Sequence, residues 1–214
     1  MGLYHAGSRG RGVKRTARHL ILSMTKTTPY KWLVLDVLPY IRFSFYYTSL
    51  KGWQYQRGYK LLEPGHYLLT DDKWKLTSIL IPGPWTHAAF CVDKDSEFEI
   101  AEMTHENFTH SMFYDICQQS TRVRIYDCYG WDAAYKQQMI EKCLSYENTP
   151  YDVSAERGDS ALTCSEMIGY LDYADRLGVS YDDALGLGIP YLSPTGLDKA
   201  KRKRLVWDSA YERR

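Results

Sequence analysis

Cysteine is scarce and unpaired in this sequence of 214 residues, and its pattern excludes several classes of protein. The five cysteines lie at positions 91, 117, 128, 143 and 164, and none of them forms a CxxC pair. A disulfide framework usually shows an even set of cysteines, and a zinc knuckle needs closely spaced ones. The histidines also lack the spacing of metal ligands, and no glycine-rich phosphate loop is present. We therefore expect a reduced protein with no metal and no cofactor.

The chain also lacks an uninterrupted apolar stretch long enough to cross a membrane. Its most apolar part, residues 32–50, is broken by Asp36, Pro39 and Arg42. This part predicts a helix that ends near Pro39 and then a strand; the alternative is a helix on a membrane surface, because aromatic and cationic residues are interleaved there. The apolar run 20–22 is too short for a signal peptide. We expect a cytoplasmic or virion-associated protein without a transmembrane segment.

Charge is almost balanced overall, at a formal +1, but it is unevenly distributed along the chain. Residues 1–63 contain eleven Lys and Arg against two acidic residues, a net of +9. Residues 64–198 contain nine against twenty-two, a net of −13, and residues 199–214 contain seven against two, a net of +5. Basic ends on an acidic body predict attraction, either to the body itself or to an acidic protein, a nucleic acid or an anionic surface.

The composition divides the chain into four parts. Residues 1–28 predict a flexible basic arm, 29–60 an apolar and aromatic extension, 61–198 the main domain, and 199–214 a basic tail. Within the main domain, turn signals separate short apolar runs that predict strands, and one amphipathic helix is predicted over 131–146. The expected strands lie around 66–70, 86–92, 98–103 and 122–126. This pattern indicates an α+β fold with helices packed on a small antiparallel sheet or half-barrel.

One cysteine stands where a helix begins. Thr163 and Glu166 have the spacing of a capping box, which places Cys164 at the first helical position. Unpaired amides and the positive end of the helix dipole favour a thiolate there, so Cys164 is a candidate nucleophile. The alternative is a buried, inert cysteine. The helix is expected to continue through Ala174, with Gly178 as its stop.

A cysteine nucleophile needs a base and a group that orients the base. His87 begins the strand predicted over 86–92, and Glu102 lies in the strand after it. With a turn near 94–96, Glu102 falls directly opposite His87, about 5 Å away at the β-carbons. We therefore predict a Cys164–His87–Glu102 triad. The alternative is a half-buried histidine beside a solvated glutamate.

Several short segments stand in a characteristic order along the chain: 64–70 with 81–89, then 100–104, 150–152, 163–166 and 191–194. Their order of histidine, acid and cysteine resembles the circularly permuted papain-like cysteine hydrolases of the NlpC type. These are related to YiiX and YebB and, more distantly, to lecithin:retinol acyltransferase. The resemblance covers roughly residues 61–198. One departure is His66, where the family usually has Asp; a packing role or a second base are its two interpretations.

The resemblance implies a thiol hydrolase that cleaves an amide or peptide bond, including isopeptide bonds and those of peptidoglycan. The amide of Cys164 would serve as one oxyanion donor. Tyr151, Asp152 and Trp85 are candidate substrate or oxyanion residues. The alternatives are an acyltransferase or thioesterase acting on acyl lipids, and a non-catalytic interaction module, for example of a viral or phage assembly.

Overall fold

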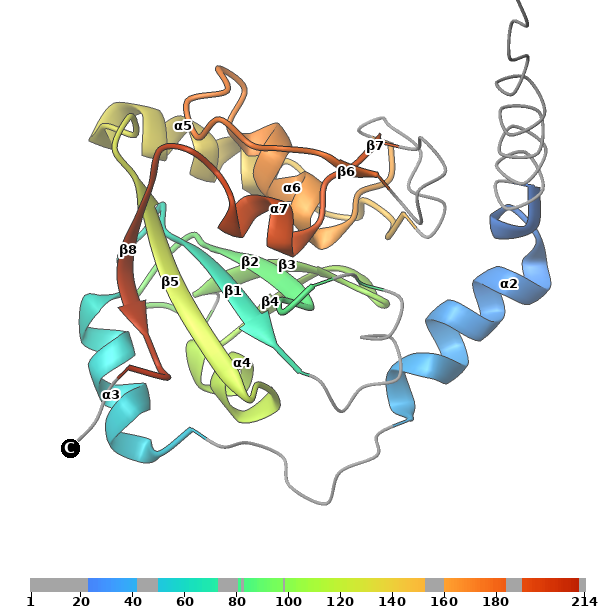
Figure 1. Cartoon of the computed structure of the whole chain (residues 1–214), viewed down its shortest axis with the longest axis horizontal. Helices are drawn as coiled ribbons and strands as arrows, with labels where there is room; N and C mark the ends of the chain where they lie inside the picture. Colours follow the sequence, from blue (N-terminus) through green and yellow to red (C-terminus); the bar gives the residue numbers. More distant parts are fainter. Residues whose placement is uncertain are drawn as a thin grey trace, which may run out of the picture.

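An antiparallel sheet forms the centre of the molecule. The computed structural model describes residues 23–41, 50–72, 81, 83–97, 99–152, 160–183 and 190–211. Within them, six strands follow one another in the order β4-β3-β2-β1-β5-β8 (Figure 1). The strands span Tyr67–Asp71 (β1), His87–Cys91 (β2), Ile100–Thr104 (β3), Asn107–Ser111 (β4), Arg122–Cys128 (β5) and Lys203–Asp208 (β8). The prediction of an antiparallel sheet packed on helices is confirmed.

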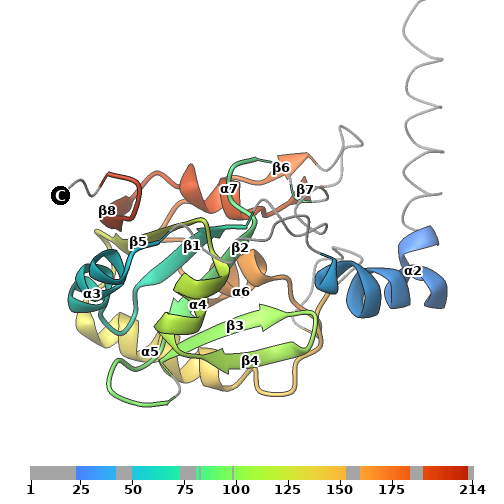
Figure 2. The ribbon, with the colours of Figure 1, turned by 90° about the horizontal axis from the view of Figure 1, so that it is seen from below.

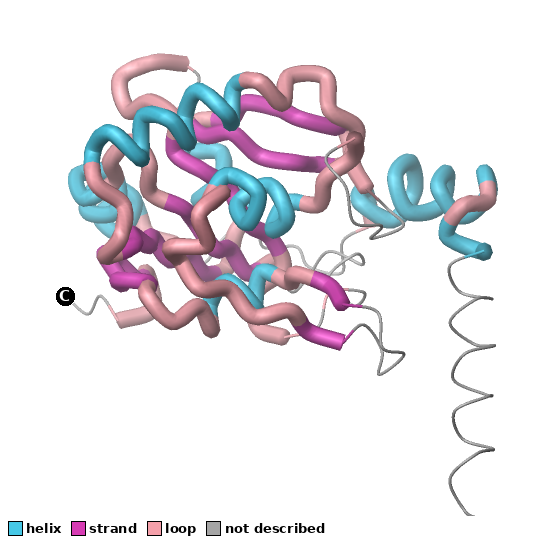
Figure 3. Tube along the Cα trace, turned by 90° about the horizontal axis from the view of Figure 1, so that it is seen from above, coloured by secondary structure: helices cyan, strands magenta, loops and turns pink. Residues whose placement is uncertain are grey.

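Helices cover both faces of this sheet. One layer consists of α5 (Ala133–Leu144), α6 (Cys164–Leu171) and α7 (Pro194–Asp198), and the other of α3 (Gly52–Leu61) and α4 (Phe113–Gln119). Seen from below, α3 and α4 lie in front of the strands (Figure 2). Seen from above, the opposite layer lies in front of them (Figure 3). The central strands are therefore enclosed on both sides.

Enclosure on both sides explains why the central strands are apolar almost throughout. Successive side chains of β2 alternate between two cores, as the period of a strand requires. Ala88 and Phe90 belong to the core under α5 and α6, whereas Ala89 and Cys91 belong to the core under α3 and α4. The small side chain of Ala88 lets α6 approach the sheet closely, and α6 packs against β2.

The helix that begins at Cys164 is shorter than predicted. It ends at Leu171, and Ala174 lies beyond it. The cause is the buried carboxylate of Asp172, which accepts hydrogen bonds from the backbone amides of Arg176 at 3.0 Å and Leu177 at 2.6 Å. To deliver these amides the chain must turn out of the helix, so the prediction of a longer helix is wrong.

The C-terminal part is not a tail beyond the sheet. Within the predicted basic tail 199–214, residues 203–208 form β8, which pairs with β5 and buries Trp207. At the other end, α3 also packs against β8 and α4. The packed unit is therefore larger than the predicted range 61–198. Charge composition suggested a tail because the first four residues of this edge strand, 203–206, are exposed or half-buried.

The N-terminal segment lies to one side of the body (Figure 1). It consists of α2 (Thr28–Trp32), η1 (Leu33–Val37) and η2 (Leu38–Tyr40), so the helix ends near Pro39 as predicted. The strand expected after it falls largely on residues 42–49, and most of the basic arm falls on residues 1–22; both lie outside the described residues. In the described part of the chain, no helix has the length and apolar character needed to span a bilayer.

Candidate active site

Cys164 occupies the first position of α6, where its sequence signal placed it. The Thr163 hydroxyl accepts a hydrogen bond from the Glu166 amide at 3.2 Å, and the Glu166 carboxylate accepts one from the Thr163 amide at 3.0 Å. This confirms the capping box. The cysteine is 3% exposed, so the positive end of the helix acts on it in a largely water-excluded setting.

His87 and Glu102 form a hydrogen bond, although not through the predicted register. Ala89, not His87, lies opposite Glu102 on the neighbouring strand, so the predicted pairing is displaced by two residues. A shift of two keeps both side chains on the same face of the sheet, because the strand period is two. Across this diagonal, His87 Nε2 lies 2.6 Å from Glu102 Oε2. The other ring nitrogen, Nδ1, takes no part in this bond.

Glu102 is itself held by a residue that the sequence did not reveal. The hydroxyl of Ser111, on β4, donates a hydrogen bond to Glu102 Oε1. One carboxylate oxygen thus serves His87 and the other Ser111, which fixes the orientation of the carboxylate. No pattern in the sequence singled out Ser111, because β4 was not predicted as a strand.

The protonation of His87 reflects these neighbours. Burial alone would lower its pKa, but hydrogen bonds and electrostatic attraction from Cys164 and Glu102 outweigh this and raise the pKa to about 10. The side chain of His87 is 24% exposed. A histidine with a raised pKa between a thiol and a carboxylate is the arrangement of a thiolate–imidazolium pair.

The segment before the cysteine contributes one wall of the site. Tyr151 forms a bridge with Leu162, and the Asp152 amide donates to the Leu162 carbonyl at 3.0 Å, so both residues lie beside the approach to Cys164. Burial and then the nearby Cys164 raise the pKa of Tyr151 well above its usual value. Two of the three candidate substrate residues, Tyr151 and Asp152, therefore lie near Cys164.

Tyr191 forms a second wall and was not among the predicted site residues. It belongs to β7 (Pro190–Tyr191), which pairs with β6 (Asp182–Asp183). The next residue, Leu192, accepts a hydrogen bond from the Ser165 hydroxyl at 2.6 Å, which ties this strand to the first turn of α6. Burial and then Cys164 raise the pKa of Tyr191. The only signal in the sequence was its place in the segment 191–194.

Trp85 is not placed to meet a substrate. It is 1% exposed, and the guanidinium groups of Arg122 and Arg124 lie 5.1 Å and 4.7 Å from its ring centre. Its contacts support the end of the sheet. His66 is also buried and lies before β1, at the end of the β1–β2 pair opposite His87. Burial, then Lys136, lowers its pKa to about 4, so His66 packs as a neutral ring remote from Cys164.

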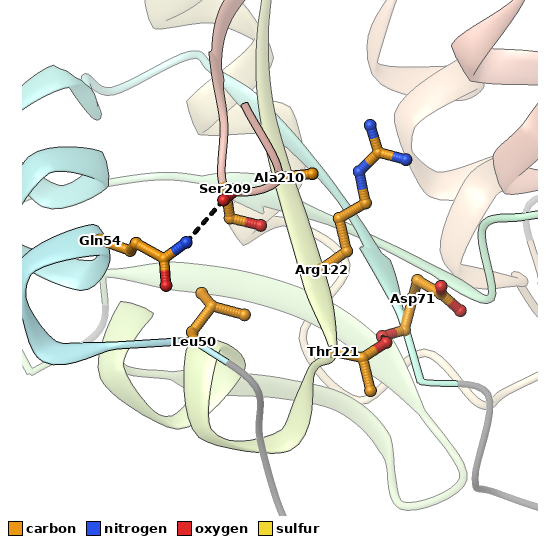
Figure 4. A pocket seen from close by; sticks show the side chains of 7 residues that line it. All are labelled: Leu50, Gln54, Asp71, Thr121, Arg122, Ser209 and Ala210. Carbon is orange, nitrogen blue, oxygen red and sulfur yellow. Dashed lines mark hydrogen bonds between the residues drawn. The ribbon is translucent and has the colours of Figure 1, made fainter. Parts of the chain in front are cut away.

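A hollow of about 370 Å³ lies between α3, β5 and the residues that follow β8 (Figure 4). Its lining includes none of the three triad candidates. The Gln54 amide donates to the Ser209 carbonyl at 2.7 Å and the Thr121 hydroxyl to the Asp71 carbonyl at 2.8 Å, so these polar groups join the elements together. We assign this hollow a structural role.

Comparison with known proteins finds a similar solved structure but no match in sequence. No family model matches the chain, and no curated protein matches it. The crystal structure of the metalloprotein YiiX from Escherichia coli O157:H7 is similar, with a TM-score of 0.51 and 12% identity. The match covers 68% of this chain and 96% of that one. At this identity the likeness concerns the fold alone, and the chain has a YiiX-like fold.

The donor set does not suit a metal in the described part of the chain. No group of three or more His, Cys, Asp and Glu side chains there is arranged to hold an ion. At the site itself, the oxygens of Glu102 are taken up by His87 and Ser111. We therefore derive no step that depends on a metal.

Proposed function

We propose that this chain is a thiol hydrolase on a circularly permuted papain-like fold, with Cys164 as nucleophile, His87 as general base and acid, and Glu102 as the group that orients the histidine. The observation that supports the proposal most strongly is the position of His87. Its ring Nε2 lies 2.6 Å from the Glu102 carboxylate, and Cys164, at a helix N-terminus, is close enough to raise the pKa of His87. Each of the three groups thus has the neighbour that its role requires.

The chemistry follows from this arrangement. The Cys164 thiol transfers its proton to His87, and the thiolate attacks the carbonyl carbon of an amide. The carbon–nitrogen bond breaks, the leaving amine takes the proton from His87, and an acyl-thioester remains on the sulfur. Water, deprotonated by His87, then attacks the thioester, and the released thiol regains the proton. The backbone amide of Cys164 is suited to stabilise the oxyanion in both steps.

The proposed substrate class is an amide or peptide bond, with peptidoglycan stems and isopeptide bonds included. Burial and then Cys164 raise the pKa values of Tyr151 and Tyr191, so both aromatic side chains lie near the sulfur, and such side chains suit the backbone of an extended peptide. Acyl lipids are a second candidate class, because the apolar N-terminal segment contacts the turn between β3 and β4, next to the site.

Alkylation by iodoacetamide tests the proposal without knowledge of the substrate. The rate at each cysteine is measured from pH 4 to 9 by peptide mass spectrometry, in the wild type and in His87→Ala. The other four cysteines are internal controls, because burial raises the pKa of Cys117 and Cys143 to about 12 and also raises those of Cys91 and Cys128.

We expect Cys164 alone to react rapidly below pH 7, and its rate in His87→Ala to fall by at least about tenfold there, because the thiolate loses its counter-charge. A Cys164 that reacts no faster than the four buried cysteines would contradict the proposal. That result would favour a non-catalytic module on the same fold.

A further inference from the structure

The N-terminal segment, residues 28–41, exposes apolar side chains that the body does not cover. Trp32 is 58% exposed, Leu33 41%, Tyr40 67% and Ile41 37%, and no residue from 28 to 41 whose burial is described is buried. In Figures 1 and 2, α2 lies beside the body, and no described helix or strand of the body lies along it. Several exposed apolar side chains gathered in one segment are typical of a site of interaction.

The charges around this segment are mainly positive. Lys31 and Asp36 are the only charged residues from 28 to 41. Over residues 1–41, seven Lys and Arg stand against this single acid. An apolar and aromatic helix preceded by a basic sequence has the composition of segments that lie in the interface of an anionic bilayer. Nucleic acid would use the cations but not the aliphatic side chains.

The helical part of the segment is too short to cross a membrane, but it is long enough to lie on the surface of one. Thirteen helical residues, 28–40, extend over about 20 Å, which is shorter than a hydrocarbon core of about 30 Å. Pro39 interrupts the helix before it could lengthen. Trp32 and Tyr40 are residue types that settle at the level of the lipid headgroups.

We propose that residues 28–41 form an interfacial segment by which this chain lies on an anionic lipid surface. In this arrangement Trp32 and Leu33 enter the headgroup boundary, and Lys31 together with the basic arm approaches the phosphates. The proposal does not depend on the hydrolase activity, because none of these side chains belongs to the candidate triad.

A contact between the segment and the body also connects the segment to the candidate active site. The Tyr40 hydroxyl is hydrogen-bonded to His105 at 3.2 Å, and the two rings meet edge to face, in the turn between β3 and β4. From the same turn, Asn107 accepts a hydrogen bond from the Tyr151 amide at 3.2 Å. Docking through this segment would therefore hold the wall of the site formed by Tyr151 near the lipid surface.

Sedimentation of the full-length protein with vesicles tests this proposal. Vesicles of phosphatidylcholine with about one third phosphatidylserine are compared with vesicles of phosphatidylcholine alone, at low and at high salt. The test variant combines Trp32→Ser and Leu33→Ser. Its matched control combines Tyr129→Ser and Leu144→Ser, which removes similarly exposed apolar side chains, 76% and 42% exposed, from the body. Urea unfolding verifies that both variants remain folded.

We expect the wild type and the control variant to bind the anionic vesicles at low salt and to bind the neutral vesicles more weakly. The test variant should bind at least about tenfold more weakly than the control. Cys164→Ala should bind as the wild type does, which separates this proposal from the hydrolase. Equal binding by the test and control variants would overturn it. The proposal would also be overturned if the wild type failed to bind the vesicles and instead self-associated in a way that the test variant abolishes.

Discussion

Opposing effects act on the protonation of His87. Burial disfavours its charged form, whereas Cys164 and Glu102 favour it, and the balance raises the pKa of His87 to about 10. In the proposed resting state the imidazolium therefore accompanies a thiolate. Because the two groups are coupled, their protons leave in steps that belong to the pair.

Removal of the charge of Glu102 should weaken this pair. In Glu102→Gln the side chain keeps its shape but no longer attracts the imidazolium, so the pKa of His87 should fall. Alkylation of Cys164 at pH 6 should slow by roughly tenfold, less than in His87→Ala, and its pH profile should move upward.

Glu106→Gln is the matched control for that substitution. Glu106 lies in the turn that follows β3, its side chain is 67% exposed, and it is outside the proposed triad. Its replacement should leave the pH profile unchanged. A profile that moves equally in both variants would show that general surface charge, and not contact with the imidazole, sets the reactivity.

The three proposed catalytic residues could be named from the sequence because each carries a local signal. Cys164 has a capping box around it, and His87 and Glu102 lie in adjacent segments joined by a short turn. Ser111 and Tyr191 could not be named in the same way. Their roles arise from contacts between elements distant in sequence, and neither residue type is unusual in its own segment.

At the scale of single elements, the cap of α6 is expected to be the most sensitive feature. Thr163→Ala removes the hydroxyl that accepts from the Glu166 amide and should lower the free energy of unfolding by about 1 kcal/mol. Thr27→Ala is the control, because Thr27 stands at the N-cap of α2 without a side-chain capping bond. Urea unfolding of both variants measures the difference; equal losses would contradict the assigned role of the cap.

Helices and strands with a strong hydrophobic periodicity were predicted near their observed positions, whereas their exact ends were not. The helix expected over 131–146 is α5, and the strand expected at 122–126 continues as β5 to Cys128. The end of α6 depends on Asp172, which also accepts hydrogen bonds from Trp131 at 3.2 Å and Tyr135 at 2.8 Å. A buried aspartate of this kind does not alter the hydrophobic periodicity of the sequence, so the end of the helix could not be predicted from it.

At the scale of the whole molecule, the C-terminal strand closes the sheet and uses part of the basic charge. Arg204 of β8 forms an ion pair with Asp127, and Lys199 lies 3.2 Å from Asp182. The positive C-terminal end thus contacts the acidic body itself, one of the two arrangements that the charge distribution predicted. Residues 1–22, which contain most of the N-terminal basic charge, lie outside the described residues.

Asp208 is the centre of the connection between β5 and β8. Its side chain is 1% exposed and accepts hydrogen bonds from Arg122 and from Arg124, each with a shortest distance of 2.6 Å. Asp208→Ala leaves two partly buried guanidinium groups without this partner and should lower the free energy of unfolding by about 3 kcal/mol. Urea unfolding of the wild type and of Asp208→Ala measures the loss.

The effect of Asp208 should also depend on pH. Burial alone raises the pKa of Asp208, but hydrogen bonds, from Arg122 foremost, lower it below its usual value. Its stabilising contribution is therefore fully present above about pH 4, the unfolded value, and is lost as the pH falls through the folded pKa. Urea unfolding from pH 7 to pH 3 should show the gap between wild type and Asp208→Ala narrowing below pH 4; a constant gap would contradict the assignment.

The pairing of Cys164 with His87 is the central claim, and an NMR titration of the His87 ring tests it most directly. Ring nitrogen shifts are followed from pH 4 to 11 in the wild type and in Cys164→Ala. We predict that His87 in the wild type stays protonated well above pH 7 and that its pKa falls in Cys164→Ala, because the thiolate is gone. A His87 that titrates near its ordinary value of about 6.5 in both proteins would contradict the thiolate–imidazolium pair.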